Sequence, residues 1–153
     1  MRMVEVPGRP ILELEHLVLD VNGTLTGHGA LIEGVEPALR KLRETLEVHL
    51  LSADTFGSLA AIAATLGVDP HVVRDGSEKA DFIREIGSKH CVAIGNGAND
   101  EAMLREAALG IAVVGPEGAT FATIAAADVV CSSIGDALAL VFSEQALSAT
   151  LRP

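Results

Sequence analysis

Four polar residues of this chain, Asp20, Ser52, Lys79 and Asp100, have side chains suited to phosphate chemistry. Asp20 and Ser52 come directly after short apolar runs, whereas Lys79 and Asp100 stand where helical segments begin after two further runs. Carboxylates are good Mg²⁺ ligands, and hydroxyl and ammonium groups bind phosphoryl oxygens. The set therefore predicts phosphoryl-transfer chemistry, provided that the fold brings the four residues together.

The elements that must position these residues follow from the apolar pattern. Strands are predicted at the apolar runs 17–19, 48–51, 71–73, 91–94, 110–114 and 129–131. Helices are predicted at 35–46, 59–66, 79–86, 100–107, 118–125 and 133–142. Strands without polar alternation are typical of parallel sheets covered on both faces. The alternation predicts an α/β fold, a three-layer α/β/α Rossmann-like domain with a parallel sheet. Ligands of such sheets bind beyond the carboxyl ends of the strands, so the four polar residues should converge there.

The chain of 153 residues is expected to form a single domain, 1–153. Residues 1–15 contain apolar side chains on both sides of a Pro7-Gly8 pair, which predicts a small antiparallel hairpin. We expect a core at 16–142 and a C-terminal tail at 143–153. The connections 27–48 and 52–79 are too short to hold a cap domain.

Charge and composition exclude several classes of function. The net charge of -10 repels nucleic-acid backbones, and no local basic patch offsets it, so we expect no nucleic-acid partner. No apolar run approaches the ~20 residues of a membrane span. The N-terminus lacks the apolar centre of a signal peptide. We therefore expect no membrane association and a cytoplasmic location, with Cys91 and Cys131 as buried, reduced thiols.

Two segments carry a resemblance to a known family. The segment 20–26, Asp-Val-Asn-Gly-Thr-Leu-Thr, resembles the first motif of the haloacid dehalogenase-like (HAD) phosphohydrolases. The segment 95–100, Gly-Asn-Gly-Ala-Asn-Asp, together with 107–112, resembles the hinge motif in the phosphorylation domain of P-type ATPases. Ser52 and Lys79 lie between these segments in the family's order, so the resemblance extends over about 17–142. It implies a capless HAD-like domain similar to a soluble form of the ATPase phosphorylation domain.

The resemblance also implies roles for individual residues. Asp20 would be the nucleophile that forms an aspartyl phosphate, and Ser52 and Lys79 would hold the phosphoryl oxygens. Further contacts to substrate or phosphate are implied for Gly23, Thr24, Ala53 and Asn99. A Mg²⁺ cofactor would be bound by the Asp20 carboxylate, the Asn22 main-chain carbonyl, Asn96 and Asp100. Without the resemblance, Asp20 also fits a carboxylate that caps the end of a strand, and Ser52 fits an ordinary loop serine. Lys79 and Asp100 likewise fit a surface lysine and an acid at a helix N-terminus.

Two positions depart from the family's pattern. Asn22 occupies the catalytic position two residues after the nucleophile, where most relatives have a second acid that protonates the leaving group. An amide cannot exchange a proton at neutral pH, and general acid–base help is commonly worth ~10²–10⁴-fold. Asn96 replaces a metal-binding aspartate, which removes one negative charge from the metal site. We therefore expect a slow Mg²⁺-dependent phosphohydrolase.

An alternative remains open, because both substitutions also fit a regulatory or interaction module that binds or stores phosphoryl groups. An uncapped site implies either a protein substrate or a phosphorylated small molecule enclosed by a neighbouring subunit, so a homo-oligomer is expected. His16, His49, His71 and His90 flank strands without the sequence spacing of zinc ligands, and no zinc site is predicted.

Overall fold

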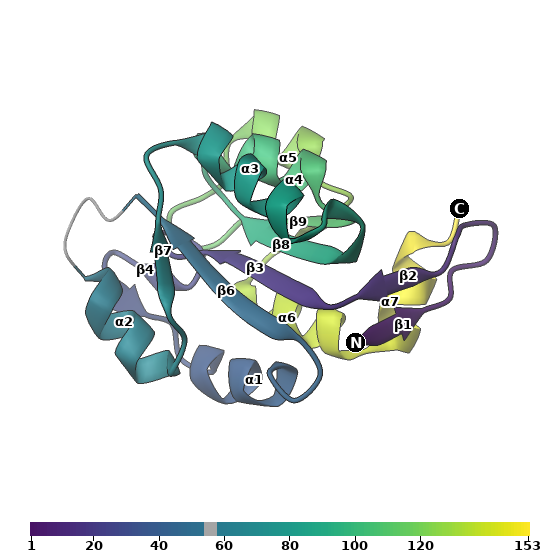
Figure 1. Cartoon of the computed structure of the whole chain (residues 1–153), viewed down its shortest axis with the longest axis horizontal. Coiled ribbons are helices and arrows are strands. Elements are labelled where there is room, and N and C mark those ends of the chain that lie inside the picture. Colours follow the sequence, from purple (N-terminus) through teal and green to yellow (C-terminus); the bar gives the residue numbers. More distant parts are fainter. Residues whose placement is uncertain (54–57) are drawn as a thin grey trace.

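A computed structural model describes residues 1–53 and 58–153 of the chain. Its centre is a parallel sheet of six strands in the order β10-β9-β8-β3-β6-β7 (Figure 1). The strands are β3 (His16–Asp20), β6 (Glu47–Ser52), β7 (Pro70–Val72), β8 (Cys91–Gly95), β9 (Leu109–Val113) and β10 (Val129–Cys131). Each corresponds to one of the predicted apolar runs, and the α/β prediction is confirmed.

Helices cover both faces of the sheet. On one face lie α1 (Val35–Leu42), α2 (Leu59–Leu66) and α6 (Ile134–Phe142), whose apolar stripes pack in one core cluster with side chains of the strands. On the other face lie α3 (Gly76–Ile86), α4 (Glu101–Glu106) and α5 (Phe121–Ala126) (Figure 1). Two short 3-10 helices, η1 (Ser88–His90) and η2 (Ala98–Asp100), flank β8. The four inner strands, β9, β8, β3 and β6, are therefore buried on both sides, which explains why their sequences lack polar alternation.

The N-terminal segment forms the predicted hairpin from β1 (Arg2–Val4) and β2 (Leu12–Leu14). The segment expected to be a tail forms a helix, α7 (Glu144–Leu151), which lies beside β1 (Figure 1). Ser143 caps this helix by accepting a hydrogen bond from the Ala146 N–H, and Leu147 and Leu151 are buried in the core. Among the described residues, no helix combines the length and apolar character needed to cross a bilayer.

The register of the central strands brings the predicted polar residues to one edge. Asp20 is the last residue of β3 and pairs with Leu51 of β6, so Ser52 lies one position beyond it on the neighbouring strand. Between β3 and α1 there is only the short hairpin of β4 (Thr26–Gly27) and β5 (Ala30–Leu31). Within 21–53 and 58–75, the structure contains no inserted cap domain above this edge.

Candidate active site

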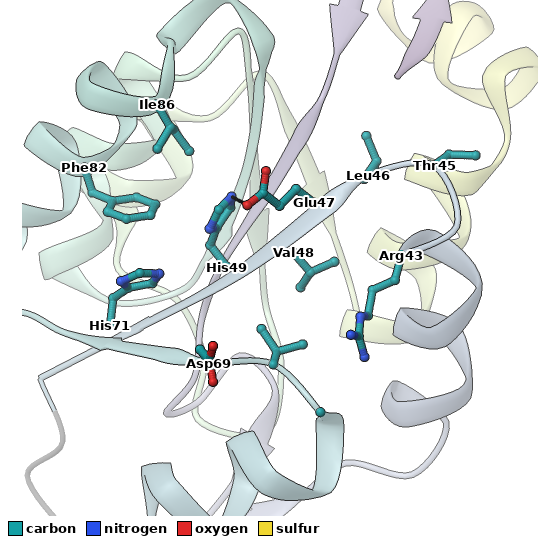
Figure 2. A pocket seen from close by; sticks show the side chains of 12 residues that line it. Arg43, Thr45, Leu46, Glu47, Val48, His49, Asp69, His71, Phe82 and Ile86 are labelled. Atoms are coloured by element: carbon teal, nitrogen blue, oxygen red, sulfur yellow. Dashed lines mark ion pairs between the residues drawn. The ribbon is translucent and has the colours of Figure 1, made fainter.

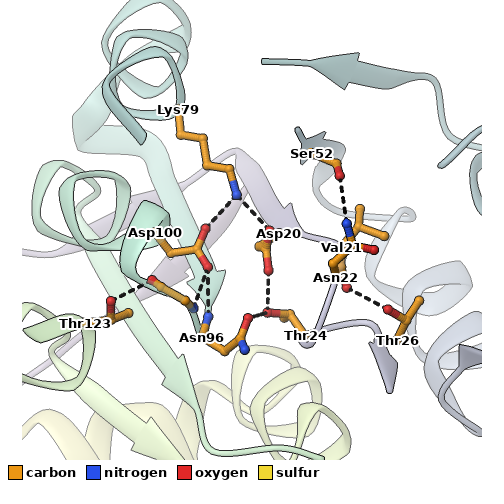
Figure 3. A network of polar contacts seen from close by, with 11 residues as sticks. Asp20, Val21, Asn22, Thr24, Thr26, Ser52, Lys79, Asn96, Asp100 and Thr123 are labelled. Carbon is orange, nitrogen blue, oxygen red and sulfur yellow. Dashed lines mark hydrogen bonds and ion pairs between the residues drawn. The ribbon is translucent and has the colours of Figure 1, made fainter. Parts of the chain in front are cut away.

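Asp20 lies at the carboxyl end of the central strand and is 5% exposed. Its Oδ1 accepts a hydrogen bond from the Lys79 ammonium at 2.7 Å, and its Oδ2 accepts one from the Thr24 hydroxyl at 2.9 Å (Figure 3). A carboxylate that ends a strand and is held from both sides has a defined orientation. It is positioned to act as a nucleophile, or as a metal ligand, without searching among rotamers.

Lys79 reaches this edge from helix α3 and is fully buried. The helix begins at Gly76, three residues before the predicted start, because the Asp75 side chain accepts hydrogen bonds from the Ser77 and Glu78 N–H groups. The ammonium of Lys79 contacts Asp20 and Asp100, both at 2.7 Å. Burial opposes the charge on Lys79, but the two carboxylates outweigh it and raise the pKa of this lysine. The ammonium therefore stays charged between them.

Asp100 is the last residue of η2, the short 3-10 helix after β8. Its side chain holds the loop between β8 and η2 in place. Its Oδ1 faces Lys79, and its Oδ2 accepts hydrogen bonds from the N–H groups of Asn96 at 2.9 Å and Gly97 at 3.0 Å. Gly95 makes this arrangement possible, since a Cβ there would lie 2.5 Å from the Asp100 carboxyl carbon. Protein donors thus contact both oxygens of Asp100. Through these contacts Asp100 positions the Lys79 ammonium and the loop at Asn96 and Gly97.

Three oxygen atoms between β3 and β8 form a cluster poor in protons. The Thr24 hydroxyl lies 2.9 Å from Asp20 Oδ2 and 3.0 Å from Asn96 Oδ1. The Asn96 amide nitrogen donates elsewhere, to the Gly118 carbonyl at 3.0 Å. Once Asp20 is ionised, the hydroxyl proton is the one proton that these three oxygens share, because an amide oxygen cannot supply another. Such an oxygen-rich cluster fits a hard cation of the Mg²⁺ type, with Asp20 and Asn96 as side-chain ligands.

The electrostatics of Asp20 also favour a nearby cation. Burial, followed by repulsion from Asp100, raises the pKa of Asp20 from 3.8 to about 7, and Lys79 and Thr24 offset only part of this effect. The ionised form is therefore disfavoured in the protein alone. Strongly shifted carboxyl groups are frequent at functional sites. A divalent cation bound beside Asp20 would restore the charged form.

This raised pKa predicts a pH-dependent stability of the metal-free protein. Between about pH 4 and pH 7 the folded protein keeps a proton on Asp20 that the unfolded chain has released. The free energy of unfolding should therefore fall as the pH rises through this window, by up to ~1.4 kcal/mol per pH unit from this group. Urea unfolding in the presence of a chelator measures it, with the Asp20→Asn variant as reference. Parallel pH profiles of the two proteins would contradict the assignment.

The remaining predicted site residues lie around this centre at different depths. The Asn22 amide donates to the Ser52 hydroxyl at 3.4 Å, and Ser52 is buried. Gly23 has φ 80° and faces Asn96, whose amide nitrogen would lie 2.6 Å from a Cβ at that position. Ala53 and Asn99 are both exposed. The structure thus brings Lys79 into direct contact with Asp20 and with Asp100. Ala53 and Asn99 lie at the rim, and their contacts with substrate remain predictions.

Two residues outside the predicted set, Thr120 and Thr123, support the site. The Thr123 hydroxyl donates to the Gly97 carbonyl at 2.7 Å, and the Thr120 N–H donates to the Asn96 carbonyl at 3.0 Å. Thr120 also caps α5 by accepting from the Thr123 N–H. The cap can be predicted from the sequence, because a threonine stands directly before an apolar helix. The contact of this threonine with the loop after β8 cannot be predicted, because the two segments are distant in sequence.

Comparisons with known proteins identify the family. The sequence model of the haloacid dehalogenase-like hydrolases matches residues 68–138. The chain belongs to this hydrolase family. A relative in Methanocaldococcus jannaschii, the uncharacterized protein MJ0073, is 49% identical over 84 residues, which cover 50% of this chain and 90% of that protein. The resemblance inferred from the segments 20–26 and 95–100 is thus confirmed.

Solved structures of two phosphatases and of an ATPase show the same fold. The cobalt-bound deoxy-D-mannose-octulosonate 8-phosphate phosphatase of Haemophilus influenzae superposes with a TM-score of 0.72 at 16% identity, covering 92% of this chain and 94% of the other. The corresponding phosphatase of Moraxella catarrhalis, solved with magnesium, phosphate and KDO, has a TM-score of 0.68 at 20% identity, with coverages of 91% and 94%. A zinc-transporting PIB-type ATPase has a TM-score of 0.67 at 24% identity, covering 79% of this chain and 20% of its own. At these identities the likeness establishes the fold.

Proposed function

We propose that this hydrolase is a Mg²⁺-dependent phosphatase that acts through an aspartyl phosphate on Asp20. The observation that carries the proposal is the buried contact of Lys79 with both Asp20 and Asp100, beside the proton-poor oxygen cluster. This arrangement supplies a nucleophile, a positive charge and a cation site at one strand edge. The phosphatase activity named for two structures of the same fold supports it.

The reaction follows from the positions of the side chains. One Asp20 oxygen attacks phosphorus in line with the leaving group, the bond from phosphorus to the leaving oxygen breaks, and the leaving group departs as an oxyanion that takes its proton from solvent. Water then attacks the phosphorus of the aspartyl phosphate, which releases inorganic phosphate and restores the carboxylate. When bound, Mg²⁺ would neutralise charge that develops on the phosphoryl oxygens. Lys79 and Ser52 hold those oxygens from the protein side.

The position of Asn22 predicts that the reaction is slow. Its amide lies 3.4 Å from the Ser52 hydroxyl, at the rim of the site, where it can position a group but cannot donate or accept a proton in catalysis. Alkyl phosphates need a protonated leaving group, whereas aryl phosphates do not. We therefore propose a phosphate monoester as substrate, cleaved with a rate that depends strongly on the leaving group.

Turnover of p-nitrophenyl phosphate with Mg²⁺ tests the proposal directly, because its leaving group needs little protonation. We expect release of inorganic phosphate that saturates with Mg²⁺ and returns to the uncatalysed level after chelation. Adding Mg²⁺ back should restore it, which separates loss of metal from loss of folded protein.

Phosphoprotein formation without repeated turnover would instead support the alternative role of a phosphoryl-storing module. Absence of both turnover and phosphoprotein would reject the proposed function.

A further inference from the structure

Three side chains with metal-binding atoms share one face of the sheet, at the opposite end of β3 from Asp20. They are His16 on β3 and Glu47 and His49 on β6. His16 pairs with Glu47 in the register of these parallel strands, and His49 lies two residues further along β6. Because side chains alternate between faces along a strand, Glu47 and His49 point to the same face of the sheet. The cluster is therefore a product of strand pairing.

The distances in this cluster fit one shared ion. The His16 Nδ1 and His49 Nε2 atoms are 3.1 Å apart. The Glu47 carboxylate lies 3.5 Å from His16 Nδ1 and 4.0 Å from His49 Nε2. Two ligand atoms that each lie ~2.0–2.2 Å from a tetrahedral Zn²⁺ are separated by about 3.3 Å. Small rotations of these side chains would thus place all three ligand atoms around one ion.

The surroundings allow an ion to enter. Glu47 and His49 line a hollow of about 750 Å³, together with His71 of β7 and Phe82 and Ile86 of α3 (Figure 2). The His49 ring packs against Phe82 with ring centroids 5.2 Å apart. The side chains of His16 and His49 are only 15% and 10% exposed, whereas that of Glu47 is 69% exposed. The two imidazoles are thus held in place, and the carboxylate is free to move from solvent onto an ion.

We propose that His16, Glu47 and His49 bind one transition-metal dication of the Zn²⁺ class, with the fourth position open toward the hollow. Two imidazole nitrogens and one carboxylate are a donor set that suits such ions and not Mg²⁺, which prefers oxygen ligands. The site is independent of the proposed phosphatase centre, because the four residue steps from His16 to Asp20 separate them by roughly 13 Å of strand.

The simpler interpretation of the same geometry is a hydrogen bond between two neutral imidazoles, with Glu47 free in solvent. It requires no ion, and it predicts that removing one histidine weakens only the local packing. The two interpretations differ in whether the untagged protein takes up a stoichiometric ion, so binding measurements distinguish them.

Zn²⁺ binding to the full, untagged chain tests the proposal. The protein is stripped with a chelator, returned to saturating Mg²⁺ and titrated with Zn²⁺ in equilibrium dialysis. The same titration is performed in an Asp20→Asn background, which removes the main carboxylate of the phosphatase centre. We expect one equivalent of bound Zn²⁺ in both proteins, and Co²⁺ in its place should give the visible absorption of a four-coordinate site. Bound ion should also raise the unfolding temperature.

Variants assign the ion to the cluster. We expect His49→Gln and His16→Gln to weaken Zn²⁺ binding by roughly 100-fold or more, and Glu47→Gln to weaken it by a factor of ~10 or more. The matched control is His28→Gln, which replaces an exposed histidine in the turn between β4 and β5, away from the three-residue cluster, and should leave the affinity unchanged. Circular dichroism of each metal-free variant separates loss of the site from loss of the fold.

Three results would overturn the proposal. The first is the absence of a stoichiometric Zn²⁺ or Co²⁺ complex in the folded wild type. The second is loss of the bound ion in the Asp20→Asn background, which would place it at the phosphatase centre. The third is unchanged binding in both folded variants, His16→Gln and His49→Gln, or a loss in His28→Gln as large as theirs.

Discussion

Replacing Asp20 with asparagine or alanine is expected to remove phosphatase turnover, with a loss of roughly 10⁵-fold or more relative to the wild type. The reason is that an amide or a methyl group cannot form the acyl phosphate, and within 1–53 and 58–153 the neighbouring carboxylate, Asp100, is already engaged. Asp100 is turned toward Lys79 and the N–H groups of Asn96 and Gly97. Steady-state release of phosphate from p-nitrophenyl phosphate measures the effect. Mass spectrometry of acid-quenched protein should find a phosphoryl group in the wild type and none in the variants.

The fold should survive this change, because Lys79 keeps its contact with Asp100 at 2.7 Å. Asp81→Asn is a matched control, since Asp81 lies on the same helix as Lys79 but its side chain is 68% exposed. Among the described residues, its ion pair is with Arg84. We expect its activity to equal that of the wild type. Turnover that persists in folded Asp20→Ala would contradict the assignment of the nucleophile.

Replacing Asn22 with aspartate is expected to accelerate hydrolysis of alkyl phosphates by ~10²–10⁴-fold. The new carboxyl group would stand at the rim of the site, near the buried Ser52 hydroxyl, where it can protonate a leaving alcohol and then activate water. Hydrolysis of p-nitrophenyl phosphate should rise much less, because its leaving group departs without a proton. The lifetime of the aspartyl phosphate should shorten in parallel. Values of kcat/KM for one alkyl and one aryl substrate measure the difference.

Gln145→Glu provides the control for this gain. It adds the same charge at an exposed position of α7, beside the N-terminal hairpin and away from Ser52. We expect little change with either substrate. An equal acceleration of alkyl and aryl phosphates in Asn22→Asp would point to charge or metal affinity as the cause, and it would argue against a missing acid at position 22.

Much of the fold and the centre of the site could be predicted from local patterns. Apolar runs without alternation predict strands buried on both faces, and Asp20 and Ser52 stand where such runs end. Parallel strands align their carboxyl ends, so residue type and position along the chain were sufficient to place these side chains at one edge. The amides Asn22 and Asn96 were equally visible, because the departure of one residue type from a motif needs no coordinates.

Two other features were not predicted from the apolar pattern. Helix α3 begins at Gly76 because Asp75 caps it, a local signal that the apolar pattern does not contain, so Lys79 lies three residues inside the helix. The C-terminal segment forms α7 because Leu147 and Leu151 find a buried surface beside the N-terminal hairpin.

The histidine cluster shows most clearly what local patterns miss. The spacing of His16 and His49 along the chain argued against a metal site, yet the pairing of β3 with β6 places their ring nitrogens 3.1 Å apart. Composition and short motifs determine which segments become strands and which polar residues follow those strands. Proximity between residues of different strands depends on register and side-chain direction, which arise only when the whole core packs.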